Sequence, residues 1–145
     1  MNKIKIIIDQ DILEKYYKWY FDKYPKRHVL PIESAISKSL NQWMIMNRQK
    51  MNHEKQKWKD FGMWLIDFYG LNNLKIKRCK IIIEYFFADK RKRDADNYLP
   101  KNLLDAFVEA GLLSDDSFNC VEALTILGNY SKNSARTEIN IEYED

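Results

Sequence analysis

The N-terminal quarter of the chain combines a short apolar run with a longer stretch of helical spacing. Residues 3–9 are rich in isoleucine and predict a strand. From Leu13 to Tyr24 apolar positions recur every three or four residues, which predicts a helix with Asp11 as its cap. Pro25 should end this helix, because proline cannot continue its backbone hydrogen bonds.

The longest helix is expected in the middle of the chain. Residues 28–41 have no clear period, so we expect a loop with a short extended piece. A helix from about Asn47 to Tyr69 follows, and Gly70 should close it. Its apolar stripe consists of Trp58, Phe61, Leu65 and Phe68.

The C-terminal half alternates strands with one more helix. A strand over 76–87 is apolar at every second position, and Ile82 and Phe86 add apolar residues on its other side, as in a central strand covered on both faces. A polar loop over 89–97 comes next.

A helix over 100–110, stopped by Gly111, follows that loop. The segments 121–127 and 136–144 predict two further strands, the second with clean alternation. This order of elements predicts an α+β fold with a small mixed β-sheet packed with helices.

Composition indicates one compact domain over residues 1–145. Of the 145 residues, 46% are hydrophobic and 14% aromatic, which suffices for a sizeable core. Cys79 and Cys120 are too few for a disulfide scaffold and are expected in that core. Apolar runs are far shorter than the roughly 18 residues of a membrane helix, and the N-terminus lacks a secretory pattern. We therefore expect a cytoplasmic protein with no membrane partner.

A formal net charge of +3 hides a sharp division along the chain. Residues 1–93 carry 21 basic and 10 acidic side chains, whereas residues 94–145 carry 3 and 11. The division favours a polyanionic partner on one surface and a cationic ligand on another. Alternatively, folding mixes these charges into an even surface.

Candidate chemistry is concentrated where the charge changes sign. The four glycines do not form a phosphate-binding fingerprint, so no nucleotide cofactor is expected. Two histidines and two distant cysteines do not make a zinc site. Asp94 and Asp96 lie two apart after a strand, which places both carboxylates on one side. Asp115 and Asp116 follow the next helix closely enough to rejoin them. Converging carboxylates of this kind select Mg²⁺, with Mn²⁺ as a substitute.

Basic residues flank these carboxylates. The run from Lys90 to Arg93 can hold phosphates beside a metal, and Lys101 can stabilise the charge that develops during phosphodiester hydrolysis. The same residues also fit a plainer interpretation, in which Asp94 and Asp96 are turn or cap residues and the basic run is simply exposed. Asn97 fits either a helix cap or a phosphate contact.

This ordered set resembles the signature of the RusA-type Holliday junction resolvases, a family common in prophages. The match runs through Arg91-Lys92-Arg93-Asp94-Ala95-Asp96-Asn97, Lys101, Leu104-Asp105-Ala106-Phe107, Ala110-Gly111-Leu112 and Asp115-Asp116. A weaker second match consists of Leu40-Asn41-Gln42-Trp43 with Asn47-Arg48 and Lys55. Two features depart from the family pattern: the lysine is displaced by one residue, with Pro100 in its usual place, and residues 1–27 are unusually aromatic.

The resemblance implies a small homodimeric endonuclease that cuts four-way DNA junctions symmetrically with Mg²⁺. By position, its metal ligands would be Asp94, Asp96 and Asp116, and Lys101 its catalytic lysine. Contacts to DNA are expected from Arg91, Lys92, Arg93, Asn97, Asn41, Arg48 and Lys55.

Two other hypotheses fit the same residues. One is a non-catalytic protein that binds branched DNA through its basic face. The other is a nuclease for flap or single-stranded DNA, whose N-terminal aromatic residues would stack on unpaired bases.

Overall fold

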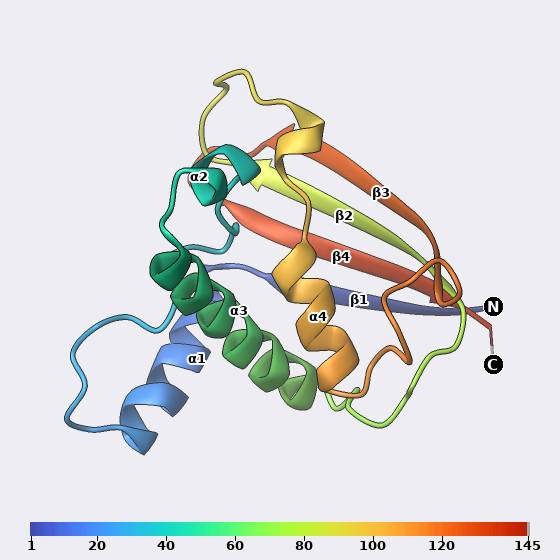
Figure 1. The fold of residues 1–145 in the computed structure, drawn as a ribbon, viewed down its shortest axis with the longest axis horizontal. Helices are drawn as coiled ribbons and strands as arrows, with labels where there is room; N and C mark the ends of the chain where they lie inside the picture. Colours follow the sequence, from blue (N-terminus) through green and yellow to red (C-terminus); the bar gives the residue numbers. More distant parts are fainter. Residues whose placement is uncertain (145) are drawn as a thin grey trace.

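A four-stranded mixed sheet forms the base of the molecule (Figure 1). The computed structural model describes residues 1–144. The strands are β1 (Asn2–Ile8), β2 (Cys79–Phe87), β3 (Val121–Tyr130) and β4 (Arg136–Tyr143), in the spatial order β1-β4-β2-β3. β4 runs antiparallel to both β1 and β2, whereas β3 runs parallel to β2. The connection from β2 to β3 therefore crosses over the sheet.

The helices of residues 1–144 lie on one face of this sheet (Figure 1). They are α1 (Gln10–Lys23), the short α2 (Leu40–Met44), α3 (Arg48–Phe68) and α4 (Lys101–Glu109), with a 3₁₀ turn, η1 (Ala95–Asn97), before α4. α3 and α4 pack against each other closely, since a Cβ at Gly62 of α3 would overlap the Cβ of Ala106 in α4. Gly62 thus allows the close spacing of α3, which carries Arg48 and Lys55, and α4, which carries Lys101.

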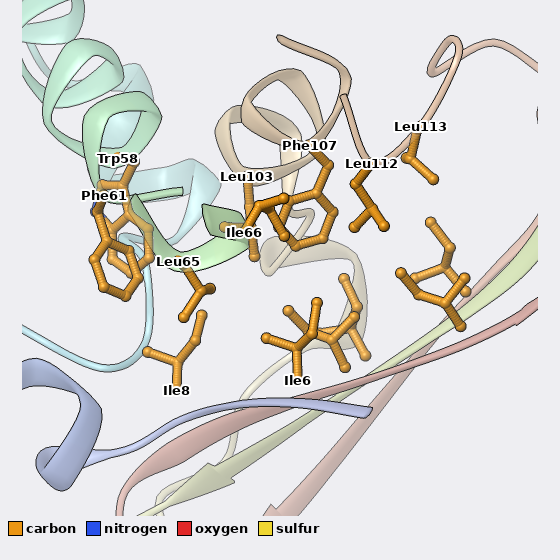
Figure 2. Packing of buried hydrophobic residues seen from close by; sticks show 14 of the residues in the cluster. Ile6, Ile8, Trp58, Phe61, Leu65, Ile66, Leu103, Phe107, Leu112 and Leu113 are labelled. Atoms are coloured by element: carbon orange, nitrogen blue, oxygen red, sulfur yellow. The ribbon is translucent and has the colours of Figure 1, made fainter. Parts of the chain in front are cut away.

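The core lies between the sheet and these helices. Figure 2 shows Phe61, Leu65 and Ile66 of α3 and Leu103 and Phe107 of α4 directed toward the isoleucines of the sheet. These side chains are all buried. This burial supplies the main stabilisation of the two-layer arrangement. The connection from β2 to β3 contains α4, so the packing of this helix anchors the loops at both of its ends to the core.

Most of the predicted elements are confirmed. Gly70 and Gly111 end α3 and α4 with φ values of +70° and +88°, a conformation that favours glycine. Alternation in β4 buries Thr137, Ile139 and Ile141. Both cysteines are free and buried, as expected.

Three expectations about the N-terminal half and β2 were wrong. Asp9, not Asp11, caps α1 by accepting a hydrogen bond of 3.0 Å from the Ile12 backbone, because the chain turns into the helix directly after β1. Phe68 is exposed, since ten residues at about 100° each bring it roughly 80° away from Trp58 around the helix.

β2 is central in the sheet but covered on one face only. Lys80 is exposed on the open face, and Ile82 and Phe86 are half-buried there. The guanidinium of Arg136 lies over the Phe86 ring at 3.8 Å and shields it from water. An apolar residue on the open side of β2 therefore did not indicate a second layer of helices.

Candidate active site

The segment between β2 and α4 carries Asp94 and Asp96 on the surface. Asp94 precedes η1 in an extended conformation, and Asp96 lies within that turn. Both side chains are exposed, and within residues 1–144 neither makes a hydrogen bond or an ion pair. The plainer interpretation is confirmed in that both aspartates belong to a turn, but Asp94 is not a side-chain cap, because its carboxylate accepts no capping hydrogen bond. Two neighbouring carboxylates are therefore free to take a cation.

Asn97 ties this segment to α2. Its side-chain oxygen accepts a hydrogen bond of 2.9 Å from the backbone N–H of Asn41, 56 residues earlier in the chain. Asn41 is in the first turn of α2, whose backbone N–H groups have no partner within the helix. Asn97 thus caps α2 from a distant part of the chain. Its hydrogen bond joins Asn97 to Asn41, two residues that the sequence indicated as separate candidates for DNA contacts.

The basic run divides into inward and outward side chains. Arg93 forms an ion pair of 2.9 Å with Asp89 and stacks on the Phe87 ring at 4.1 Å. Hydrogen bonds from the Arg91 backbone and then from Arg93 hold the pKa of Asp89 below its ordinary value. Arg91 and Lys92 are exposed. Arg93 therefore shapes the loop, whereas its two neighbours are available to an anionic partner.

A second cluster forms at α4. The carboxyl groups of Asp105 and Asp116 are hydrogen-bonded to each other, and the ammonium groups of Lys55 and Lys101 act on Asp105. Burial is the main cause that raises the pKa of Asp105, followed by the hydrogen bond and the charge of Asp116. The two lysines oppose this rise. The fold thus unites residues from α3, α4 and the loop after α4.

Asp115 belongs to the turn rather than to this pair. Its carboxylate accepts a short hydrogen bond from the Ser117 hydroxyl, which is the main cause that lowers the pKa of Asp115. Of the two adjacent aspartates, Asp116 is therefore the one directed to α4. Within residues 1–144, no three His, Cys, Asp or Glu side chains form a group that could hold a metal ion.

Comparison with known families identifies the chain. The model of the family described as endodeoxyribonuclease RusA matches residues 9–142. The chain belongs to the RusA family. It is thus an endodeoxyribonuclease, a hydrolase that acts on DNA phosphodiester bonds, of a family of Holliday junction resolving enzymes. A search of curated proteins gave no match. No helix within residues 1–144 has the length and apolarity needed to cross a bilayer.

Metal dependence is general in RusA-type nucleases. Within residues 1–144, Asp116 does not come together with Asp94 and Asp96 as a group of three, so the fit to a hard cation rests on the type of donor. Within residues 1–144, the carboxylates of Asp94 and Asp96 have no protein partner. The carboxyl of Asp116 interacts with Asp105 and with the neighbouring Asp115. Carboxylate oxygens without histidine or cysteine suit Mg²⁺ or Mn²⁺.

The contact between Asp105 and Asp116 was missed as a pair in the sequence analysis. Lys101 and Asp105 are spaced i, i+4 on α4, which signals a shared helix face, but nothing in the sequence places Asp116 there. A second missed feature is the buried Glu54, which pairs with Lys38 at 3.0 Å and Lys57 at 3.7 Å. It lines a cavity of about 350 Å³ beside the Arg93 loop.

Proposed function

We propose that the chain is a Mg²⁺-dependent endonuclease that resolves Holliday junctions by two symmetric phosphodiester cuts, with Mn²⁺ able to replace Mg²⁺. The observation that carries the proposal is the pair of exposed carboxylates, Asp94 and Asp96, which have no partner among residues 1–144 and lie beside the exposed cations Arg91 and Lys92 in the chain. Carboxylates that hold a metal, adjacent to cations that hold phosphate, are what phosphodiester hydrolysis requires.

Asp94, Asp96 and Asp116 are proposed to hold the metal. When bound, a divalent cation polarises a phosphoryl oxygen and lowers the pKa of a bound water. Lys101, the exposed first residue of α4, would stabilise negative charge on the reacting phosphate or on the leaving oxygen. The charge of Lys101 also acts on Asp105, the residue that interacts with Asp116.

DNA contacts are proposed on two sides of this site. Arg91 and Lys92 would neutralise phosphates on one side, with Arg48 and Lys55 of α3 on the other. Asn41 and Asn97 support this surface through their hydrogen bond, so that the loop and α2 are held in one orientation. Arg93 contributes by fixing the loop conformation rather than by reaching outward.

The substrate implied by the family, branched DNA, fits a homodimer acting in the cytoplasm. Two symmetric cuts require two equivalent active sites related by a two-fold axis. One domain of residues 1–145, including its aromatic segment 1–27, supplies one such site. The free thiols of Cys79 and Cys120 are consistent with a reducing compartment.

The test is cleavage of a synthetic four-way junction in the presence of Mg²⁺, Mn²⁺ or EDTA. Flap, splayed and linear duplex DNA of the same sequences serve as competitors. We expect paired nicks in opposite strands that ligase can reseal, and none in EDTA. Junction binding without cleavage in either metal would instead indicate a non-catalytic binding protein, and preferred cleavage of flap or single-stranded DNA would change the substrate.

A further inference from the structure

An aromatic groove lies between α1, α3 and the loop after α1 (Figure 1). Its volume is about 700 Å³, twice that of the cavity beside the Arg93 loop. The walls include Trp19 and Tyr20 from α1 and Trp64 and Phe68 from α3. Trp19 and Phe68 are 41% and 48% exposed. The aromatic groove therefore leaves ring surface in water that a ligand could cover.

Several of these rings lie nearly parallel to one another. Tyr16 and Trp19 are stacked with an interplanar angle of 15° and centroids 5.9 Å apart. Trp64 and Phe68 are stacked at 17° and 5.1 Å. The buried Tyr16 connects the two pairs, because its ring lies 5.1 Å from that of Trp64. Such a set of flat rings suits a planar ligand, and every nucleobase has a planar face that can stack on an aromatic side chain.

The end of the aromatic groove formed by α1 and its loop is positively charged. Residues 23–28 carry three lysine or arginine side chains and no acidic one. Lys23 lies over the Trp19 ring at 5.0 Å, and the Arg27 guanidinium lies over the Tyr24 ring at 3.8 Å. Within residues 1–144, neither cation forms an ion pair. Both can therefore turn to a phosphate without leaving a carboxylate unpaired.

The acidic residues of the aromatic groove come from α3 instead. They are Asp60, which accepts a hydrogen bond of 2.7 Å from Gln56, and Asp67, which accepts one of 3.4 Å from Asn72. Carboxylates repel phosphates but accept hydrogen bonds from the amino groups of bases. This division of charge favours a ligand whose phosphates face α1 and whose bases face α3.

The aromatic groove is continuous with the surface that is proposed to contact DNA. Lys57 of α3 lines both this groove and the cavity beside the Arg93 loop. His53 also lines the groove, and it follows Arg48 by five residues, or about 7.5 Å of helix. A DNA strand that leaves the basic loop can therefore reach the groove along α3.

We propose that the aromatic groove binds an unpaired segment of the substrate DNA. Bases would stack on Trp19 and the neighbouring rings, and phosphates would contact Lys23 and Arg27. The inference rests on the proposed function and deepens it, since it adds a single-stranded subsite to a nuclease for branched DNA. The subsite would act in substrate binding and not in the cutting step.

Single-stranded DNA fits this groove better than other ligands do. Duplex DNA keeps its base faces inside the helix, so it would not use the exposed rings. An apolar peptide would use the rings but not the cations of α1 and its loop. A strand with free bases and a charged backbone uses both features. A peptide that is both acidic and aromatic is the alternative that the experiment must separate.

Binding of a short oligo(dT) to the full chain in EDTA tests the proposal. Fluorescence anisotropy compares an oligo(dT) about 12 nucleotides long with an abasic strand of equal length, which keeps the phosphates and lacks the bases. We expect the abasic strand to bind at least about 10-fold more weakly, because stacking is lost. Oligo(dT) should also quench tryptophan fluorescence, since Trp19 and Trp64 line the groove.

Two substitutions of one side chain separate stacking from general apolar contact. Trp19→Leu keeps an apolar side chain without a ring and should raise the dissociation constant of oligo(dT) about 10-fold. Trp19→Tyr keeps a ring and should change it by less than about threefold. Circular dichroism checks that both variants fold, as expected for a side chain that is 41% exposed.

A matched pair of lysines on α1 tests the charged end. Lys23→Ala should reduce the slope of log affinity against log salt by about 0.7, the value for one phosphate contact with a single strand. Lys18 is on the same helix, is exposed and pairs with Asp22 at 3.7 Å, but it does not line the groove. Lys18→Ala should leave the slope unchanged.

Crosslinking locates the strand on the wild-type protein and does not depend on any variant. Oligo(dT) that carries 5-iodouracil should crosslink on irradiation to peptides that contain Trp19 or Trp64. Crosslinks confined to the basic loop, residues 90–93, would place the strand elsewhere and overturn the proposal.

Other outcomes also overturn it. These are equal affinity for the abasic strand, or unchanged affinity in Trp19→Leu. A peptide of alternating aspartate and phenylalanine that quenches tryptophan fluorescence where oligo(dT) does not would assign the groove to a protein partner.

Failure of this inference is distinguishable from failure of the proposed function. Asp94→Asn should abolish cleavage and leave oligo(dT) binding in EDTA unchanged. Oligo(dT) binding at the aromatic groove without nuclease activity would retain this inference and reject the function. Junction cleavage by a protein that does not bind oligo(dT) would do the reverse.

Discussion

The side-chain oxygen of Asn97 accepts a hydrogen bond of 2.9 Å from the backbone N–H of Asn41. This single bond joins the loop of Asp94 and Asp96 to the start of α2. Asn97→Ala should lower the free energy of unfolding by about 1 kcal/mol, as for loss of a helix cap. Asn97→Asp keeps an acceptor at the same place and should cost much less. Urea titration measures both, and equal losses would show that the bond contributes nothing specific.

The contact between Gly62 and Ala106 sets the distance between α3 and α4. Gly62→Ala should destabilise the protein by about 1–3 kcal/mol, because the added methyl group overlaps Ala106. Gly62→Ala with Ala106→Gly restores the space and should recover much of the loss beyond the helix cost of glycine. Thermal unfolding compares the two. If the single variant gains stability, as an unobstructed glycine-to-alanine change in a helix would, the close packing is contradicted.

Asp105 should make stability depend on pH. Its pKa is raised, first by burial and then by Asp116, so the folded protein holds a proton that the unfolded chain releases. Stability is therefore lost as the pH rises from the ordinary value of 3.8 through the raised pKa. In EDTA, Asp105→Asn should melt higher than wild type near pH 7, with a smaller difference near pH 3.5.

The matched change at a free carboxylate is Asp96→Asn. It should show no comparable difference between the two pH values, because Asp96 is exposed and has no partner within residues 1–144. An Asp105→Asn variant less stable than wild type at neutral pH would show that the ionised side chain is favoured in the folded protein, contrary to this account.

The exposed side chains of the basic loop, Arg91 and Lys92, should affect DNA binding differently from the inward-facing Arg93. Arg91→Ala and Lys92→Ala should each reduce the slope of log affinity against log salt by about 1, through loss of one phosphate contact. Arg93→Ala should mainly lower the thermal midpoint, because it removes the ion pair with Asp89 and the stacking on Phe87. Fluorescence anisotropy with a metal-free junction gives the slopes. A full loss of slope in Arg93→Ala at unchanged stability would reverse these roles.

Regular elements with one buried face could be predicted from the sequence. β4 alternates strictly because Ile139 and Ile141 point to the core while their neighbours do not. Glycine at the ends of α3 and α4 marked their termini for a conformational reason. The short α2 was missed as a helix, although its Ser39 and Gln42 form a capping box that the spacing S-x-x-Q signals.

Features that depend on the free edge or on loop geometry could not be predicted in the same way. β3 continues to Tyr130, three residues beyond its expected end, because a strand exposed on both faces has no alternation to mark its length. The order of Asp94, Asp96 and Asp116 indicated shared chemistry. The partner that Asp116 contacts, Asp105, depends on how the loop after Gly111 folds back, which no local pattern encodes.

The most direct test of the central claim is cleavage of a four-way junction by Asp94→Asn beside wild type and Asp11→Asn, a remote surface control. We predict symmetric cleavage by wild type and the control in Mg²⁺. The cleavage rate of Asp94→Asn should fall at least about 100-fold, with junction affinity in EDTA unchanged within about twofold. Equal cleavage by Asp94→Asn, or no cleavage by wild type in either Mg²⁺ or Mn²⁺, would contradict the account.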